Sequence, residues 1–190
     1  TTLYQYNSKN ELSYTAVDMN QNDTIDFSGA DRINWTTNDV ATDHSTTVRR
    51  SRTYAWAQNG VNSSSLLSLS ETSADGLNSW QVKYGNASTA VTNSTVTSYS
   101  GSSRSTIATA PDGSYTINTY AYGRLVASTR YDSASAQIGG TTYAYDAHGR
   151  QFQMTDARNG TTTYGYNDAD QMNSVAAPMS ETTTTLYDTM

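Results

Sequence analysis

Three similar stretches lie near the C-terminal end of the chain: TTYAYDAHGR (residues 141–150), TTYGYNDADQ (residues 162–171) and TTTLYDTM (residues 183–190). They place a tyrosine followed by Asp or Asn at steps of 21 residues, at Tyr145, Tyr166 and Tyr187. Self-similarity at a fixed interval of this length is typical of repeat architectures, in which each copy forms one small structural unit. Residues 141–188 therefore predict the architecture more directly than any other part of the chain.

Each copy has the composition of a strand, a turn and a returning strand. Asp146 can accept hydrogen bonds from the backbone that follows it, and Gly149 suits the conformation required by a type I turn with a bulge. The expected unit is a β-hairpin of about 20 residues, which is marginal by itself and needs neighbours along its edges. The residues expected to define this structural repeat are Tyr143, Tyr145, Asp146, Gly149, Arg150, Gly160, Tyr164, Tyr166, Asn167, Tyr187 and Asp188.

The overall composition favours an all-β chain without a large aliphatic core. Hydrophobic residues make up 35% of the chain, below the roughly 45–50% usual for globular domains when glycine is included. The 15 tyrosines and 3 tryptophans partly make up this deficit, because aromatic rings bury an apolar face and keep a polar group for a partner. No apolar stripe of helical period persists over three turns. We therefore expect stacked antiparallel hairpins that form a strip of a spiralling β-sheet or shell.

Charge and composition exclude several classes of function. A net charge of −6 argues against a nucleic-acid partner, because phosphate binding depends on clustered Lys and Arg. The short basic cluster of Arg49, Arg50 and Arg52 is expected to be a solvated strand face. The chain has no cysteine, which excludes disulfides and thiolate metal sites. It has no apolar run of about 18 residues, so no membrane span is expected.

The clarity of the repeat divides the chain into two regions. Residues 110–190 contain the clear copies, and the third copy breaks off at the end, so we expect the chain to be an excerpt of a longer one. Residues 1–109 are expected to form diverged hairpins of the same kind. Within them, residues 46–56 have a strand-like composition, and residues 80–84 alternate between apolar and polar side chains. The Ser/Thr-rich residues 87–109 are interpreted as polar strands in preference to a linker.

An acidic insertion at residues 18–31 contains the one motif with metal-binding chemistry. The sequence DMNQNDTID, residues 18–26, spaces oxygen ligands as an EF-hand-type Ca²⁺ loop does. Position 6 is Asp23 instead of Gly, and position 12 is Gly29 instead of Glu, although the nearby Asp31 can substitute. The alternative is an acidic surface loop that joins two hairpins. The ligands of a structural Ca²⁺ ion would be Asp18, Asn20, Asn22, Thr24, Asp26 and Asp31.

No catalytic residue is predicted, and we expect that the chain is not an enzyme. His148 lies beside Asp146, but the matching place in the next copy is Ala169 and no nucleophile motif accompanies it. His44, between two polar neighbours, is assigned no role. Exposed aromatic rings suit a carbohydrate-binding platform, yet the tyrosines recur with the repeat, so we favour stacked tyrosine ladders that hold adjacent hairpins together.

The pattern Tyr-x-Tyr-Asp-x-x-Gly-Arg, followed by Thr155-Asp156 and Gly160, resembles the YD repeat of the RHS (rearrangement hot spot) family, which includes toxin-complex C components and the teneurins. The resemblance is specific over residues 113–188 and weaker over residues 1–15. Departures occur where Asn167 replaces Asp and where Asp170-Gln171 replaces Gly-Arg, which argues for a turn function and against catalysis.

The resemblance implies a secreted or cell-surface polypeptide whose hairpins join into a hollow β-shell. That shell encloses a toxin domain or mediates contact between cells. The implied partners are the remainder of a longer parent chain and an enclosed toxin domain. The alternative function is a calcium-dependent or carbohydrate-binding surface adhesion module, with a glycan or cell-surface partner.

Overall fold

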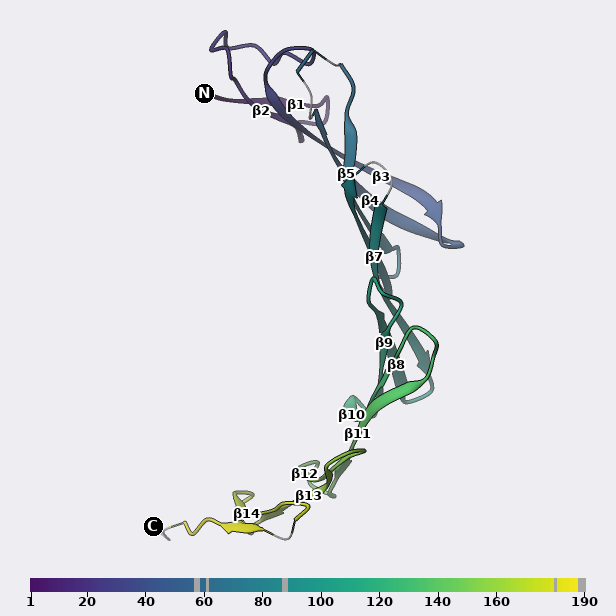
Figure 1. Cartoon of the computed structure of the whole chain (residues 1–190). Helices are drawn as coiled ribbons and strands as arrows, with labels where there is room; N and C mark the ends of the chain where they lie inside the picture. Colours follow the sequence, from purple (N-terminus) through teal and green to yellow (C-terminus); the bar gives the residue numbers. More distant parts are fainter. Residues whose placement is uncertain (57–58, 61, 87–88, 180, 188–190) are drawn as a thin grey trace. The chain divides into compact units, whose positions relative to one another are not determined.

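The fold is all-β in the computed structural model, which describes residues 1–56, 59–60, 62–86, 89–179 and 181–187 (Figure 1). Fifteen strands form one antiparallel sheet in which the strand order follows the chain order. In the part of the chain that is described, no helix is long and apolar enough to cross a membrane. The prediction of stacked antiparallel hairpins in a strip of sheet is therefore confirmed.

The strand bounds show that most neighbouring strands are joined by short turns. The first seven strands are β1 (Thr2–Tyr6), β2 (Leu12–Val17), β3 (Arg32–Asp43), β4 (Thr46–Trp56), β5 (Ser65–Ser73), β6 (Asn78–Asn86) and β7 (Thr89–Ser100). The next eight are β8 (Ser103–Thr109), β9 (Tyr115–Ala121), β10 (Arg124–Tyr131), β11 (Gln137–Tyr145), β12 (Gln151–Asp156), β13 (Gly160–Tyr166), β14 (Met172–Ala176) and β15 (Thr182–Thr184).

Internal contacts divide the chain into two compact units, Thr1–Val96 and Thr97–Met190. Strand β7 contributes residues to both units, because the division falls within it. This division follows packing, whereas the sequence boundary after residue 109 followed the regularity of the repeat. The two units are described separately below.

In the first unit, aromatic side chains form a row across one face of the sheet. Tyr14 on β2 is paired with Trp35 on β3, which is paired with Tyr54 on β4. Residues paired in this way lie on the same face of a sheet, because side chains alternate along each strand. The ring of Trp35 stacks on both neighbours, with centroid distances of 5.8 Å to Tyr14 and 4.8 Å to Tyr54.

The acidic insertion covers the next pairs along this face. Ala16 pairs with Ile33, which pairs with Trp56. Phe27 of the insertion contacts the Trp56 ring edge-on, at a centroid distance of 5.2 Å. Beneath this cover Ala16 is 0% exposed and Ile33 is 2% exposed. The insertion, which contains no strand as expected, thus completes a small hydrophobic core.

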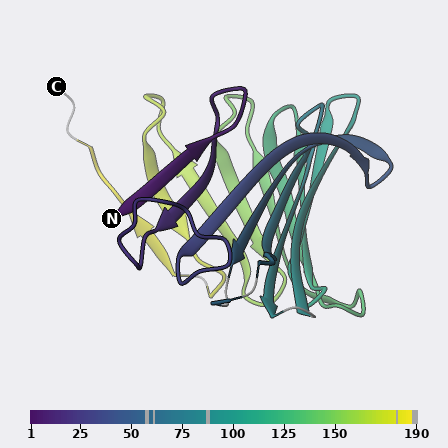
Figure 2. The same ribbon diagram turned by 90° about the horizontal axis from the view of Figure 1, so that it is seen from above.

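The β3–β4 hairpin is long, and Figure 2 shows it (blue) curving along its length towards its tip. Two positive backbone φ angles, 49° at His44 and 60° at Ser45, form the tight turn at that tip. Near it, Val48 is fully buried beside its β5 partner Ser73. A second buried patch therefore forms where β4 pairs with β5 close to this turn.

The second unit consists of hairpins whose strands are mostly half-buried. None of its described side chains is fully buried, since the residues with the lowest exposure all lie before residue 74. The turn between β9 and β10 is formed by Tyr122 and Gly123, with φ angles of 50° and 81°. This two-residue turn accounts for the contracted copy of the repeat at residues 123–126.

Several local expectations are confirmed. Residues 80–84 alternate between half-buried and exposed positions on β6, and residues 89–100 and 103–109 form strands. The expected solvated strand face is seen at Arg49, which is exposed, whereas Arg50 and Arg52 are half-buried. Their side chains are 19% and 25% exposed, and both pair with Asp39 on β3. The reason is that the register of β3 and β4 places Asp39 opposite Arg50.

Candidate functional site

The repeat turns share one hydrogen-bonding pattern, in which an Asp or Asn side chain holds the turn closed. In the β11–β12 turn, Oδ1 of Asp146 accepts hydrogen bonds from the backbone N–H groups of His148 (3.0 Å) and Arg150 (2.9 Å). In the β13–β14 turn, Oδ1 of Asn167 accepts the equivalent bonds from Ala169 (3.1 Å) and Gln171 (2.9 Å). Asp and Asn are therefore interchangeable at this position, because both offer the same acceptor oxygen.

The same turn also occurs twice outside the regular copies. Asn7 holds the β1–β2 turn by accepting from two backbone amides, at 2.9 Å and 3.0 Å. Asp132 holds the β10–β11 turn in the same way, at 3.0 Å and 2.8 Å. The turn at Asp132 was missed by the sequence reasoning, although the preceding Tyr131 is a usable signal. The Tyr131-Asp132 pair is hard to recognise as a copy because it does not lie 21 residues from the next Tyr-Asp pair.

The fourth residue of each of these turns has a positive φ angle. The values are 83° at Gly149 and 62° at Asp170, and Asn10 in the first hairpin also has 62°. Glycine adopts this conformation without strain, and Asn and Asp tolerate it better than most residues. The Gly-to-Asp difference between copies is thus compatible with one turn geometry.

The repeat tyrosines join successive hairpins through their hydroxyl groups. Each hydroxyl donates a hydrogen bond to a backbone carbonyl in the preceding hairpin. The acceptor is the first or the second residue of the strand that follows the turn of that hairpin. The bonds run from Tyr145 to Leu125 (2.8 Å), from Tyr166 to Gln151 (2.7 Å) and from Tyr187 to Met172 (2.7 Å). Each acceptor directly follows the Arg or Gln that ends the preceding turn. Asp188, which follows Tyr187 in the third copy of the repeat, lies outside the described residues.

The arginine of one turn lies over the tyrosine ring of the next copy. The guanidinium carbon of Arg124 is 5.6 Å from the ring centroid of Tyr145, and that of Arg150 is 4.5 Å from the ring of Tyr166. Cation–π contacts of this kind stabilise exposed sites by about 0.5–1 kcal/mol. The expected ladder of stacked rings is therefore wrong for these tyrosines, because arginine occupies the space beside each ring. Ring stacking does occur between Tyr115 and Tyr131, at 4.8 Å.

Arg150 also forms ion pairs within its own turn and with the next one. Its Nε donates to Oδ2 of Asp146 at 2.7 Å, and its Nη1 pairs with the carboxylate of Asp170. The hydrogen bond from Arg150 is the main cause that lowers the pKa of Asp146 below its usual value. His148 is mostly exposed and its Nδ1 lies 3.2 Å from Asp170, so it belongs to this surface network.

Gly149 in one copy and Asp170 in the next also differ in how they contact the arginine of the preceding turn. A Cβ atom on residue 149 would clash with Nη2 of Arg124, so the arginine of the preceding turn occupies the space next to this glycine. Asp170, at the matching position of the next copy, forms an ion pair with Arg150 instead. The fourth turn residue thus contacts the preceding arginine in both copies.

The remaining repeat residues are strand and turn positions. Tyr143 and Tyr164 are half-buried on β11 and β13. Gly160 begins β13 with a φ angle of 90°, which a residue with a side chain rarely adopts. The preceding turn is closed by Asp156, whose pKa is lowered mainly by the hydrogen bond from the backbone N–H of Asn159.

In the acidic insertion, two buried carboxylates bind backbone amides. Asp18 is 3% exposed and Asp31 is 5% exposed. The bonds to Asp18 come from Asn22 (3.3 Å) and Asp23 (3.0 Å), and those to Asp31 come from Asp26 (2.9 Å) and Met19 (3.0 Å). The backbone hydrogen bonds, that from Asp26 first, lower the pKa of Asp31. Asp31 therefore stays ionised while it closes the loop.

The other predicted ligands surround a second carboxylate group. The side-chain amides of Asn20 and Asn22 both donate to Oδ2 of Asp26, at 2.7 Å and 2.9 Å. Thr24 donates its backbone N–H to Oδ1 of Asn22, at 2.9 Å. The predicted ligands thus bind N–H groups of the insertion itself, and among the described residues its carboxylates form no group of three close enough to share an ion. Ca²⁺ binding at these residues stays a prediction.

Comparisons with known proteins do not assign the chain. No protein-family model matches it, and no curated protein matches its sequence. The resemblance to the YD repeat thus rests on the residues quoted above. A functional assignment therefore depends on the geometry of the repeat and of the insertion.

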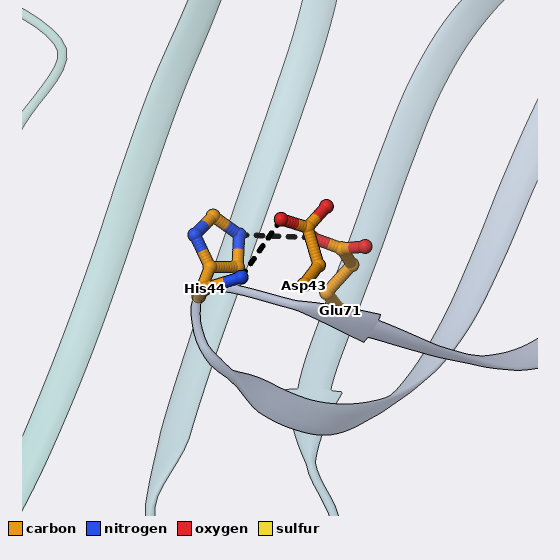
Figure 3. A group of neighbouring side chains, drawn as sticks. All are labelled: Asp43, His44 and Glu71. Atoms are coloured by element: carbon orange, nitrogen blue, oxygen red, sulfur yellow. Dashed lines mark hydrogen bonds and ion pairs between the residues drawn. The ribbon is translucent and has the colours of Figure 1, made fainter.

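A further group of polar side chains was missed by the sequence reasoning. Asp43, His44 and Glu71 each place one ligand-type atom within 4.8 Å of the others (Figure 3). Glu71 lies on β5, far along the chain from the β3–β4 turn. The sequence motif around His44 is uninformative because the group forms only when the hairpin tip meets β5. It is the one such group among the residues that the structure describes.

Proposed function

We propose that the chain is a structural repeat scaffold, part of an RHS/YD-repeat β-shell that encloses a toxin or mediates surface contact. In this proposal the chain is not an enzyme and belongs to a secreted or cell-surface polypeptide. The observation that supports it most strongly is the repeated bond from a tyrosine hydroxyl to the carbonyl of the preceding hairpin. These bonds use the most recognisable residues of the repeat to hold hairpins side by side.

The charged residues of the repeat support the same function. Arg150 contacts its own turn through Asp146 and the next copy through Tyr166 and Asp170. A catalytic constellation would direct such groups at a substrate, whereas these groups satisfy one another. Nearest-neighbour contacts of this kind are the main source of stability in repeat proteins, in which each unit is too small to fold alone.

Protease protection tests the scaffold proposal in the polypeptide that carries this chain. The triple variant Tyr145→Phe, Tyr166→Phe, Tyr187→Phe removes the three hydroxyl donors and keeps the rings. If the repeats enclose a cargo segment, trypsin cleaves that segment faster in the variant than in the wild type. Tyr122→Phe is the matched control, because that side chain is 82% exposed in a turn. A cargo segment that is cleaved in the folded wild type as fast as in the denatured protein contradicts enclosure, and equal protection in the wild type and the triple variant contradicts a role for the hydroxyl bonds.

The second candidate function is a calcium-dependent surface module. It is favoured by the burial of Asp18 and Asp31 in an insertion that is also anchored by Phe27. Calorimetry with Ca²⁺ should then show heat that is lost in Asp26→Asn, and chelation should lower the melting temperature. Absence of both effects contradicts Ca²⁺ binding.

A carbohydrate-binding surface is separated from the scaffold by a glycan array. The first-unit rings of Tyr14, Trp35 and Tyr54 stack on one another, which leaves less of their faces for a sugar. The scaffold proposal expects no selective glycan binding by the full chain. Selective binding that is lost in Trp35→Ala would support the adhesion module instead.

A further inference from the structure

The group formed by Asp43, His44 and Glu71 includes no residue of the repeat turns or of the acidic insertion. Asp43 ends β3, His44 is in the β3–β4 turn, and Glu71 lies within β5. Nε2 of His44 is 3.0 Å from Oε2 of Glu71. Figure 3 shows the Asp43 carboxylate on the same side, next to the imidazole and the Glu71 carboxylate.

The strand register places the surroundings of this group on one face of the sheet. Arg50 pairs with Glu71, and Glu71 pairs with Trp80, so these residues are neighbours on one face. The imidazole of His44 stacks on the Trp80 ring, with a centroid distance of 3.9 Å and an interplanar angle of 13°. This contact orients the ring and directs its Nε2 at the carboxylate of Glu71.

The burial of Glu71 is the independent observation that indicates a ligand. The residue is 1% exposed, and its Oε1 has no hydrogen-bond partner among the described residues. Nη1 of Arg50 forms a long ion pair with this oxygen at 3.9 Å, which is beyond hydrogen-bond distance. A buried carboxylate oxygen without a partner is strongly unfavourable unless another positive group compensates it.

The short hydrogen bonds of Arg50 go to another carboxylate, so it donates none to Glu71. Its Nε and Nη2 donate to the two carboxylate oxygens of Asp39, at 2.9 Å and 2.8 Å. Arg52 also donates to Asp39, at 3.2 Å. Asp39 thus takes the short hydrogen bonds of both guanidinium groups, and Arg50 keeps only the long ion-pair contact of 3.9 Å with Oε1 of Glu71. The group of Asp43, His44 and Glu71 therefore consists of two carboxylates and one imidazole.

We propose that Asp43, His44 and Glu71 bind a divalent transition-metal ion of the Zn²⁺ type. One imidazole nitrogen and carboxylate oxygens form a ligand set that Zn²⁺ accepts, and three protein ligands leave a position for water. Ca²⁺ is disfavoured at this site because it prefers oxygen ligands throughout. The metal supplies a directly bound positive partner for the Glu71 carboxylate, whose Oε1 has only the long contact with Arg50.

The metal would fasten the tip of the β3–β4 hairpin to β5. Without it, the tip is held by the His44–Glu71 contact and by the stacking on Trp80. The site is independent of the proposed scaffold function, because none of its ligands belongs to a repeat turn. A bound ion stabilises the folded chain because the unfolded chain lacks the assembled site.

Calorimetry with ZnCl₂ on the full chain, freed of metal by chelation, tests the proposal. We expect one equivalent of Zn²⁺ to bind, and saturating Zn²⁺ to raise the melting temperature by about 5 °C. His44→Gln and Glu71→Gln should each weaken the binding by at least about tenfold, because each removes one of three ligands. If Glu71→Gln does not fold by circular dichroism, His44→Gln decides, since His44 lies at an exposed turn.

Two control variants locate the metal. His148→Gln removes the only other histidine, which lies in an exposed repeat turn, and Asp26→Asn alters the acidic insertion. Both should bind Zn²⁺ as the wild type does. The proposal is overturned if the wild type binds no Zn²⁺, if His44→Gln binds it unchanged, or if either control variant abolishes the binding.

Discussion

The two compact units stabilise the same kind of sheet in different ways. Among the described residues, the nearly fully buried side chains all lie in the first unit: Ala16, Asp18, Asp31, Ile33, Val48, Glu71 and Ser73. In the second unit, where none of the described side chains is fully buried, successive hairpins are joined by tyrosine hydroxyls and arginines. A single sheet layer therefore gains a core only where another segment of chain covers one of its faces.

The difference shows what the insertion and the long hairpin contribute. Phe27 and the hairpin tip cover parts of the first-unit sheet, and these segments have no counterpart in the repeat. The second unit relies on a rule that is local and repeated, in which each turn supplies contacts for the next. We expect substitutions to be severe and localised in the first unit, and milder in the second.

The largest effect is expected for Ile33→Ala. Ile33 is 2% exposed beneath the insertion, and removal of such a buried side chain costs about 2–5 kcal/mol. Urea unfolding monitored by hydrogen exchange of individual peptides should show that the stability is lost in residues 1–96. Ile117→Ala on the half-buried β9 is the matched control and should cost less than half as much. Equal losses in the two units would remove the distinction between them.

Gly149→Ala is expected to have the next largest effect. The φ angle of 83° is unfavourable for alanine, and the new Cβ meets Arg124. We expect a loss of about 1–2 kcal/mol, measured by thermal unfolding. Gly149→Asn should lose less, because Asn10 has a φ angle of 62° at the matching position of another turn. Equal losses would show that the clash with Arg124 outweighs the backbone strain.

Tyr166→Phe isolates one bond between hairpins in the second unit. The variant loses the hydrogen bond of 2.7 Å to the carbonyl of Gln151 and keeps the ring beneath Arg150. The expected cost is about 0.5–1.5 kcal/mol, the usual net contribution of one hydrogen bond. Chemical denaturation measures it, with Tyr122→Phe as the neutral control. A cost as small as that of the control would mean that the hydroxyl bonds do not couple the hairpins.

The smallest effect is expected from the charge of Asp146. Its pKa is lowered in the folded chain, chiefly by the hydrogen bond from Arg150, whereas the unfolded value is about 3.9. The carboxylate therefore stabilises the fold above the unfolded pKa, and this contribution is lost as the pH falls through the folded pKa. The second unit should become less stable below about pH 4.

Asp146→Asn tests this pH dependence with the turn intact. Asn167 holds the equivalent turn with an amide, so the variant keeps the acceptor oxygen and loses only the charge. The fall in melting temperature between neutral and acidic pH should be smaller in the variant than in the wild type. A fall of the same size in both proteins would contradict a role for this ion pair.

Much of the fold could be predicted from the sequence because hairpins are local structures. The Tyr-Asp and Tyr-Asn pairs marked two of the turns, and alternation on residues 80–84 marked a strand face. The turn at Asp132 could not be predicted from the repeat interval, because the Tyr131-Asp132 pair does not lie 21 residues from another Tyr-Asp pair. The role of Arg150 was incompletely predicted, since its partner Tyr166 belongs to the following copy.

The sequence by itself determined the strands and turns, because Asx side chains and residues that tolerate positive φ act over five residues or fewer. Only the tertiary structure decided which side chains are buried and which ones meet. Asp39 meets Arg50 through the register of β3 and β4, and His44 meets Glu71 because a curved hairpin brings its tip onto β5. Contacts of this range depend on how strands pair and curve, and no short stretch of sequence encodes that.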